Sequence, residues 1–427
     1  MGISSEPQER LSVDEIDLSD IGGFWALPLA EREGAFVTLR RERPVAFFEE
    51  PELMGLQRGP GYWAVTRYAD VVEASRRPDV FCSGLGATTM IDLPVAFREY
   101  FGGMINADDP RHARLRRIVS RAFTPKRLSA LAGEVARVTG EILDAVCEKG
   151  ECDFATDVAA PLPLRVTCDL MGIPASEQAF VLEKTNLLIG VTDPELIAED
   201  ADLLSAVLSA GIELGELVRE LGRARREEPT SDVISALVNA ELDGETLSFD
   251  ELASAFILLV VAGNETTRNA INWGLVNLCE QPGQRAAWEA DFEALAGRAV
   301  EEIVRWSTPV IQMRRTLTCD AMLGGRQLRK GEKVLLFYNS ANRDEEAFDA
   351  PYSFEVGRAD NRHLGFGGYG PHYCLGVHLA RLEVTSMFRE LFRRVPDIQP
   401  SAEPERLRSH FINGIKHLPC EFTPSER

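Results

Sequence analysis

The stretch from Ser248 to Glu280 constrains the fold more than any other part of the chain. Ser248 and Glu251 have the spacing of a capping box, a pattern that begins α-helices. Leu252 to Ala262 is apolar on every side of such a helix, and a helix that is apolar all round is buried. At roughly 33 residues the helix would be about 50 Å long. We therefore expect it to run through the middle of the protein.

A polar cluster follows the apolar run at once, in the sequence Ala262-Gly263-Asn264-Glu265-Thr266-Thr267. Polar groups deep inside a central helix are costly unless they have partners or a function. Thr266 can donate a hydrogen bond to the carbonyl of Ala262, one turn earlier, and loosen the helix there. Beyond Gly263 the helix is too polar to span a membrane. The cluster is either a buried polar patch satisfied by its neighbours or a site of chemistry.

Helical periodicity dominates the rest of the chain, which has 427 residues. Helices are expected at residues 126–148, 176–190, 199–224, 248–280, 293–307 and 375–395. Short strand patterns occur at residues 62–66, 334–338 and around 417–422. The predicted fold class is therefore mainly α with small peripheral β-sheets. Because no linker, repeat or low-complexity tract is visible, we expect one domain at residues 21–427 after a flexible N-terminal arm at residues 1–20.

The bulk composition narrows the classes of function. A net charge of -21 argues strongly against a nucleic acid as partner. No apolar run reaches about 18 residues and no signal peptide is visible, so we expect a cytoplasmic protein without a membrane anchor. The eight cysteines lack paired spacing, which indicates reduced thiols. We also expect a monomer.

One stretch departs from the acidic average. Between Asp108 and Arg127 there are seven basic residues and two acids. A basic face on an acidic protein suits the docking of an acidic partner, although an ordinary solvated helix face would look the same. The basic residues are Arg111, Arg114, Arg116, Arg117, Arg121, Lys126 and Arg127.

A second segment, residues 365–376, also points to a site. It contains Cys374 together with five glycines and one proline. Glycine lets a backbone bend with positive φ and approach a flat object closely. A helical pattern follows the cysteine, and a thiolate at a helix N-terminus is stabilised by free amides and the helix dipole. This arrangement suits a soft ligand of iron. Taken alone, the cysteine could equally be a buried free thiol.

Charged residues in other segments could accompany such a site. Glu302 and Arg305 are three apart on one predicted helix and can form an ion pair, although Glu301 could pair with Arg305 instead. A further set consists of four cationic donors in segments far apart in sequence. The two propionates of a porphyrin need such donors when they are buried. The four are His112, Arg116, Arg315 and His372.

Together these pieces resemble the cytochrome P-450 superfamily of haem-thiolate monooxygenases, from about Phe24 to Phe422. The resemblance implies a triangular prism with haem b between the long central helix and the cysteine loop with its C-terminal helix. Any one motif is weak or moderate, but their order and spacing are those of the family. The motifs are His112-x-x-x-Arg116, Ala262-Gly263-x-Glu265-Thr266, Glu302-x-x-Arg305, Arg315 and the loop from Phe366 to Gly376.

The resemblance also implies roles for individual residues. Cys374 would be the axial thiolate ligand of the iron, and Phe366 would shield its sulfur from solvent. Glu265 and Thr266 would deliver protons for the activation of dioxygen. The cofactor-binding set implied in this way is His112, Arg116, Arg315, His372, Phe366, Gly370 and Gly376. Glu302 and Arg305 would be a structural ion pair, with Arg358 as a third partner.

The cysteine loop is one residue longer than the commonest family pattern, because Phe366 lies eight residues before Cys374. The longer loop is similar to that of an actinobacterial subgroup that hydroxylates terminal methyl groups of methyl-branched lipids and sterol side chains. The start Phe24-Trp25-Ala26-Leu27 and the run Met313-Arg314-Arg315 favour the branched-lipid branch. Further similar stretches are 260–269, 338–345 and 411–416.

The resemblance extends to partners and substrate. The chain has no flavin or nicotinamide domain, so a ferredoxin with its reductase would supply electrons, docking on the basic stretch of residues 111–127. The substrate would be hydrophobic and bound by area. The candidate lining residues, each of which could also be ordinary core, are Met90, Ile91, Leu93, Phe97, Phe101, Leu258, Val261, Ala262, Val310, Ile311, Phe411 and Ile412.

Three other functions compete with lipid hydroxylation. The first, in the same fold, is a tailoring hydroxylase of a polyketide or terpenoid natural product. The second is a haem-binding sensor or carrier with little turnover, and the third is a peroxide-driven enzyme. The intact Glu265-Thr266 pair disfavours the last two, because neither needs an acid beside a hydroxyl.

Overall fold

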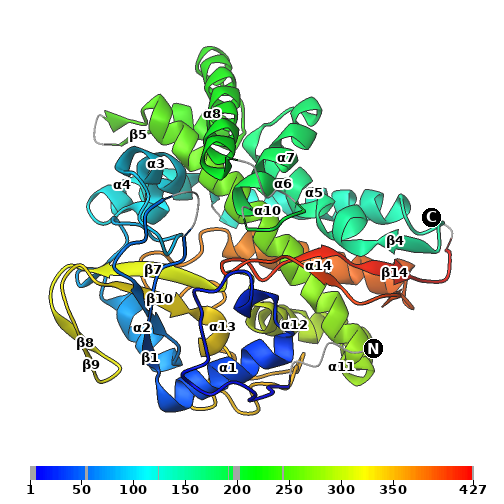
Figure 1. The fold of residues 1–427 in the computed structure, drawn as a ribbon. Helices are drawn as coiled ribbons and strands as arrows, with labels where there is room; N and C mark the ends of the chain where they lie inside the picture. The colour runs from blue at the N-terminus through cyan, green and yellow to red at the C-terminus, as the bar shows by residue number, and fades with distance from the viewer. Residues whose placement is uncertain are drawn as a thin grey trace.

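The computed structural model describes residues 6–52, 56–123, 125–190, 192–195, 202–242 and 245–425. Its longest helix is α10, Phe249–Glu280, which crosses the middle of the molecule (Figure 1) and packs against α6, α8, α12 and α14. The predicted capping box is present, with Ser248 accepting from the amide of Glu251 and the Glu251 carboxylate accepting in return. The prediction of a buried central helix is therefore confirmed. Within the described residues, no helix is apolar over a length that could cross a membrane.

The other helices surround α10, and the predicted ones are present with shifted ends. The helix expected at 126–148 ends at Asp144, because residues 145–149 form turns. The helix expected at 199–224 begins at Leu203, where the Asp202 side chain caps the amide of Ser205; residues 199–201 lie outside the described residues. The α-helices are α1 Leu29–Glu42, α2 Tyr68–Arg76, α3 Val95–Gly102, α4 Arg111–Ser120, α5 Pro125–Asp144, α6 Pro161–Met171, α7 Gln178–Ile189, α8 Leu203–Glu227, α9 Val233–Val238, α11 Pro282–Ala290, α12 Phe292–Ser307, α13 Tyr338–Ala341 and α14 Val377–Arg394.

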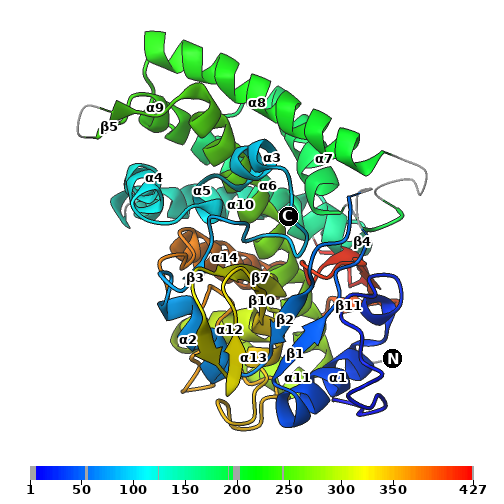
Figure 2. The ribbon, with the colours of Figure 1, turned by 60° about the vertical axis from the view of Figure 1, so that its left-hand side comes forward.

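The strands form one five-stranded sheet and several smaller pieces. The larger sheet has the order β1-β2-β10-β7-β3, with β10 parallel to β2 and antiparallel to β7. It lies on the side of the molecule opposite α8 and α9 (Figure 2). The strands are β1 Val45–Phe48, β2 Tyr62–Val65, β3 Phe81–Cys82, β4 Glu151–Asp153, β5 Glu241–Leu242, β6 Glu245–Thr246, β7 Gln312–Leu317, β8 Ala321–Leu323, β9 Arg326–Leu328, β10 Lys333–Phe337, β11 Gln399–Pro400, β12 Glu405–Arg406, β13 Ile415–His417 and β14 Pro419–Glu421.

The N-terminal segment differs from the flexible arm expected at residues 1–20. Residues 1–5 lie outside the described residues, but Ile16 and Leu18 are buried in a core cluster with Phe24 and Trp25. The indole nitrogen of Trp25 donates to the carbonyl oxygen of Leu18 at 2.9 Å. Ile16 and Leu18 help to hold this part of the segment on the protein, because each removes apolar surface from water.

Candidate functional site

A cavity lies between α10 and the loop that precedes α14, and we call it the central cavity. It is lined by residues that are up to 280 positions apart in the sequence, from Met104 to Val384. Thr266 comes from α10, Cys374 from the loop and Arg315 from β7. The predicted site residues that line it are His112, Arg116, Leu258, Ala262, Thr266, Val310, Arg315, Phe366, His372, Cys374 and Gly376.

Cys374 lies in a loop that closes on itself. Its amide donates to the carbonyl oxygen of Phe366 at 2.8 Å, and Gly367 between them has φ +105°, a conformation that favours glycine. Burial raises the pKa of the Cys374 thiol, while the amide of Gly376 and the guanidinium of Arg116 act in the opposite direction. A bound metal ion would overcome the effect of burial, because coordination deprotonates a thiol outright.

Gly370 has a different position from the one its predicted role implies. It does not line the central cavity, and a Cβ on it would collide with the backbone oxygen of Ser75 at the end of α2. Glycine is needed here so that the loop can approach α2 closely. Gly370 therefore supports the loop from behind, at a distance from the cavity.

The four predicted cationic donors surround one part of the central cavity. The rings of His112 and His372 are 4.3 Å apart, and a guanidinium nitrogen of Arg116 donates to the carbonyl oxygen of Tyr373 at 2.5 Å. Burial, with the charge of Arg315 and the other basic groups, lowers the pKa of His372 to about 2. Nε2 of His112 is buried without a hydrogen-bond partner among the described residues.

This donor set fits an anionic cofactor. Glu383 is the only carboxyl group among the described residues that line the central cavity, so the guanidinium groups of Arg116 and Arg315 have little negative charge beside them there. Buried cations need paired anions. The two carboxylates of a porphyrin meet that need, and the unpartnered Nε2 of His112 can serve one of them.

The polar cluster of α10 faces two directions. The hydroxyl of Thr266 donates to the carbonyl oxygen of Ala262 at 2.8 Å, as the sequence predicts, and Thr266 lines the central cavity. Glu265 does not line it. Its carboxylate pairs with Arg268 at 2.9 Å and lies beside Asn269, because consecutive residues of a helix point in different directions.

Glu265 lines a second cavity instead, on another side of α10. This second cavity holds about 160 Å³ and is also lined by Arg268. At its outer end Lys416 and His417 meet Glu195 in ion pairs. The acid and the hydroxyl that the sequence predicts as neighbours thus belong to two cavities, separated by the helix itself.

The Glu302 and Arg305 side chains are fully buried and form a two-bond ion pair, with both distances at 2.8 Å. Nε of Arg358 lies 3.1 Å from the same carboxylate, so the third partner is present. Arg305 also donates to backbone carbonyl oxygens of Asn342 and Pro351. A buried ion pair tolerates its loss of water only when its remaining donors are satisfied, as they are here.

Most predicted substrate-lining residues lie outside the central cavity. Met90, Ile91 and Ile311 are in the core cluster that holds Trp25, and the ring of Phe97 contacts that of Phe101 with ring centroids 4.5 Å apart. Met90, Ile91 and Ile311 lie in irregular segments, where no period reveals which way each side chain points. The remaining predicted residues that do not line the cavity are Leu93, Val261, Phe411 and Ile412.

Sequence reasoning missed part of the lining. Thr167, Leu170 and Met171 come from α6, whose helical pattern starts at a proline and was not among the expected helices. The proline at the first helical position is a signal that could have revealed it. Glu383 on α14 was also missed, because an acid in an amphipathic helix usually faces solvent.

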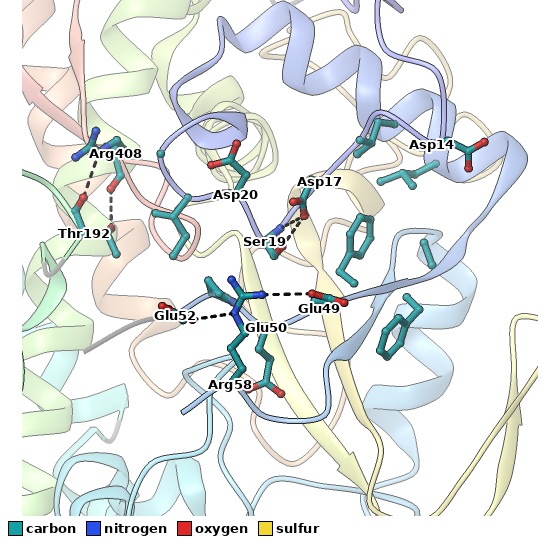
Figure 3. Close-up of a pocket in the computed structure, with 18 of the residues that line it drawn as sticks. Asp14, Asp17, Ser19, Asp20, Glu49, Glu50, Glu52, Arg58, Thr192 and Arg408 are labelled. Atoms are coloured by element: carbon teal, nitrogen blue, oxygen red, sulfur yellow. Dashed lines mark hydrogen bonds and ion pairs between the residues drawn. The ribbon is translucent and has the colours of Figure 1, made fainter. Parts of the chain in front are cut away.

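A larger cavity, of about 960 Å³, lies elsewhere. It is bounded by residues 13–22, the end of β1 and residues 192–194, and Figure 3 shows six of its carboxylates. Arg58 pairs there with Glu49 at 3.4 Å and with Glu52 at 3.5 Å. None of the predicted site residues lines this cavity, so size alone does not identify the site.

The site has a cysteine just before a helix, basic groups on one side of the cavity and a helix that carries a threonine on another. These features define the class of haem-thiolate proteins. A sequence profile of the cytochrome P450 family matches residues 213–395. The relatives described next are similar over nearly the whole chain, and the protein therefore belongs to the cytochrome P450 family.

Two curated relatives have names that describe a reaction. The methyl-branched lipid omega-hydroxylase of Mycobacterium tuberculosis is 46% identical over 99% of this chain and 98% of its own length. The steroid C26-monooxygenase of Mycolicibacterium smegmatis is 38% identical over 90% of this chain and 89% of its own. A solved structure of a Mycobacterium marinum cytochrome P450 in complex with pseudoionone has a TM-score of 0.92 at 40% identity, covering 97% of this chain and 100% of that one.

These similarities confirm several predictions from the sequence. The fold is that of a cytochrome P450, mainly α with small sheets. The protein is a monooxygenase that uses dioxygen, and its cofactor is haem, with iron held by a cysteine thiolate.

Proposed function

We propose that this monooxygenase hydroxylates the terminal methyl group of a methyl-branched lipid, an isoprenoid or a sterol side chain. The observation that carries the proposal is the 46% identity, end to end, with an enzyme named methyl-branched lipid omega-hydroxylase. The long cysteine loop from Phe366 to Cys374 supports it. So does the apolar lining of the central cavity by Leu258, Val310 and Met313, which suits a substrate bound by area.

Cys374 is the proposed axial ligand. When haem is bound, it supplies the activation of dioxygen that inserts one oxygen atom into a C–H bond. The amide of Gly376 and the charge of Arg116 favour the thiolate, and Phe366 covers the loop beside it. His112, Arg116, Arg315 and His372 bind the propionates, which supply the anions that this basic group needs.

Protons reach the reaction through α10. Glu265 takes a proton at its carboxylate from the second cavity, and Thr266 holds the proton at its hydroxyl in the central cavity. The hydroxyl of Thr266 bonds to the carbonyl oxygen of Ala262. Such a bond can weaken the helix ladder, and water could then join Glu265 and Thr266 at this place. A carboxyl group and a hydroxyl are the least that such a transfer requires.

A ferredoxin is the proposed electron donor, docking on α4. Arg111, Arg117 and Arg121 are exposed at this surface, while Arg114 pairs with Glu251 and Arg116 turns inward to the cavity. The side chains of Lys126 and Arg127 lie outside the described residues. An exposed basic face on an acidic protein attracts an acidic partner and speeds its association.

The proposal is tested by titrating the haem-loaded protein with ligands and following the spin-state change of the haem. The panel contains methyl-branched fatty acids, isoprenoids, cholestenone and macrolactones. We expect branched lipids or isoprenoids to bind most tightly and to be hydroxylated at the chain end. A response to macrolactones alone would show a tailoring hydroxylase of natural products instead.

A further inference from the structure

Residues 83–108, which we call the roof segment, supply part of the central cavity. Met104 and Ile105 near the end of the segment line the cavity. The segment contains α3, which lies between α8 and the five-stranded sheet in Figures 1 and 2. Tyr100 at the end of α3 donates to the carbonyl oxygen of Gly211 on α8 at 3.1 Å. Any shift of this segment therefore alters the walls of the cavity.

The roof segment is closed on itself by its own polar side chains. The carboxylate of Asp108 accepts from the amides of Ser83 at 2.8 Å and Gly84 at 2.9 Å. The side chain of Asn106 accepts from the amide of Ala87 at 2.9 Å. These bonds join the beginning of the segment to its end, so that a force on the first half is transmitted to Met104 and Ile105.

Two cations of the sheet grip the first half. Arg314 on β7 donates to Asp92 at 2.8 Å and to the carbonyl oxygen of Ile91 at 3.1 Å, and its amide donates to Ala87 at 2.9 Å. Lys333 on β10 lies 2.8 Å from the other carboxylate oxygen of Asp92. Arg314 pairs with Leu335 in the sheet register, two residues from Lys333, so both cations project from the same face.

The burial of these groups makes the grip specific. The side chains of Arg314 and Lys333 are 3% and 2% exposed, whereas that of Asp92 is 53% exposed. Lys333 has a buried partner of its own in Glu50, at 2.6 Å. Asp92 is the one carboxylate that reaches Arg314 among the described ion pairs, and a buried cation is costly without one.

Strand β7 links this grip to the site. Met313 and Arg315 line the central cavity, while Arg314 between them faces the roof segment. Successive side chains of a strand point to opposite faces. The same strand therefore supplies part of the cavity wall and the residue that contacts the roof segment.

We propose that Arg314 is a positioning residue: through Asp92, and with Lys333, it fixes the roof segment over the bound substrate and thereby selects which carbon is hydroxylated. The class of substrate rests on the proposed function. The grip itself rests on the contacts of Arg314, Asp92 and Lys333.

The test compares haem-loaded wild type with Arg314→Gln, Arg314→Lys and Asp92→Asn. Two quantities are measured: the ratio of terminal to internal hydroxylation of a branched lipid, and hydrogen exchange of the amides of residues 86–106. We expect Arg314→Gln and Asp92→Asn to raise exchange, to raise KM more than they lower kcat, and to reduce the ratio on the order of tenfold. Arg314→Lys keeps one charge and restores part of the ratio.

The double variant Arg314→Gln/Asp92→Asn should lose less than the sum of the two single changes, because both remove the contact between Arg314 and Asp92. Lys330→Gln, exposed in the turn before β10, is the matched control and should change neither quantity. Unchanged exchange and an unchanged ratio in Arg314→Gln would overturn the grip. If no lipid binds wild type but exchange still rises in Arg314→Gln and Asp92→Asn, the grip stands and the proposed substrate class fails.

Discussion

Thr266 holds its hydroxyl in the central cavity, one turn beyond the carbonyl group that it contacts in α10. Its neighbour Glu265 is buried on another side of the helix, paired with Arg268. At the scale of single residues, the proposed proton delivery therefore requires a transfer around the helix backbone. Two predictions concern buried polar groups of this kind.

The first prediction is that Thr266→Ala separates oxygen consumption from product formation. The change removes the hydroxyl that is proposed to hold the proton, and the yield of product per oxygen consumed should fall about tenfold or more. Oxygen uptake and product are measured in the same reaction. Thr266→Ser retains the hydroxyl and should stay near wild type; an unchanged yield in Thr266→Ala would refute the role.

The second prediction concerns Glu383, which is buried on α14 with Oε1 unpartnered among the described residues. Burial raises its pKa to about 8, against an ordinary value of 4.5. The folded state then keeps a proton that the unfolded state loses. The stabilising effect of that proton is complete below pH 4.5, and it decreases as the pH rises toward 8, by up to about 1.4 kcal/mol per pH unit.

Glu383→Gln cannot titrate, so this decrease should be missing from the variant. The free energy of unfolding of the haem-loaded protein is measured in denaturant at pH 5 and pH 7.5 for both chains. Between those values wild type should lose more stability than the variant. Parallel losses in the two proteins would mean that Glu383 is already ionised in the folded state.

At the scale of elements, α4 has one face on the central cavity and another exposed to solvent. His112 and Arg116 point into the central cavity, whereas Arg117 is exposed on the other face. We predict that charge reversal at Arg117 and Arg121 slows reduction by ferredoxin several-fold and leaves substrate affinity unchanged, because docking charges act mainly on association. Rapid mixing with reduced ferredoxin measures the rate at two salt concentrations.

The matched control for α4 is Arg326→Glu, which reverses an exposed charge on β9. It should leave the reduction rate unchanged. The effect at Arg117 and Arg121 should shrink as salt rises, since screening weakens exposed charges. Equal rates for wild type and the α4 variant would exclude this face as the docking surface.

The sequence predicts where helices begin and which residues bond within a turn better than it predicts which way each side chain faces in the fold. The capping box at Ser248 and the bond of Thr266 to Ala262 depend on residues three or four apart, so local spacing is enough to find them. The separation of Glu265 from Thr266 depends on how α10 is rotated against its neighbours. That rotation is set by packing over the whole core, which no local pattern contains.

The same limit explains the lining residues. Leu258 and Ala262 line the central cavity, because the helical period places them on the face of α10 that carries Thr266. Ile91 and Ile311 lie in irregular or short segments and turn into the core instead. Glu302 and Arg305 were found by spacing, but their complete burial was not.

At the scale of the whole molecule, the N-terminal segment is part of the fold. Leu18 is fully buried against Trp25. The ring of Trp25 stacks on Phe337 of the five-stranded sheet, with ring centroids 6.3 Å apart. We predict that Leu18→Ala lowers the free energy of unfolding by about 2–5 kcal/mol, the usual cost of such a cavity. Denaturant titration of the haem-loaded protein measures it.

Asp14→Ala is the control for this segment. Asp14 pairs with Arg43 at 2.8 Å on the surface, and exposed pairs contribute at most about 1 kcal/mol. A loss at Leu18 no larger than the loss at Asp14 would show that residues 6–20 do not stabilise the domain in solution.

The two cavities on different sides of α10 have a consequence for the size of substrate that the enzyme tolerates. In the proposed reaction, water that brings protons would approach Glu265 from the side of His417, whereas a bound lipid would lie on the side of Cys374. A bulky chain can therefore displace all solvent around its own reacting carbon without cutting the supply of protons. Excluding water from the substrate and supplying protons through water conflict in a single cavity. In the proposed reaction they would take place in two separate cavities.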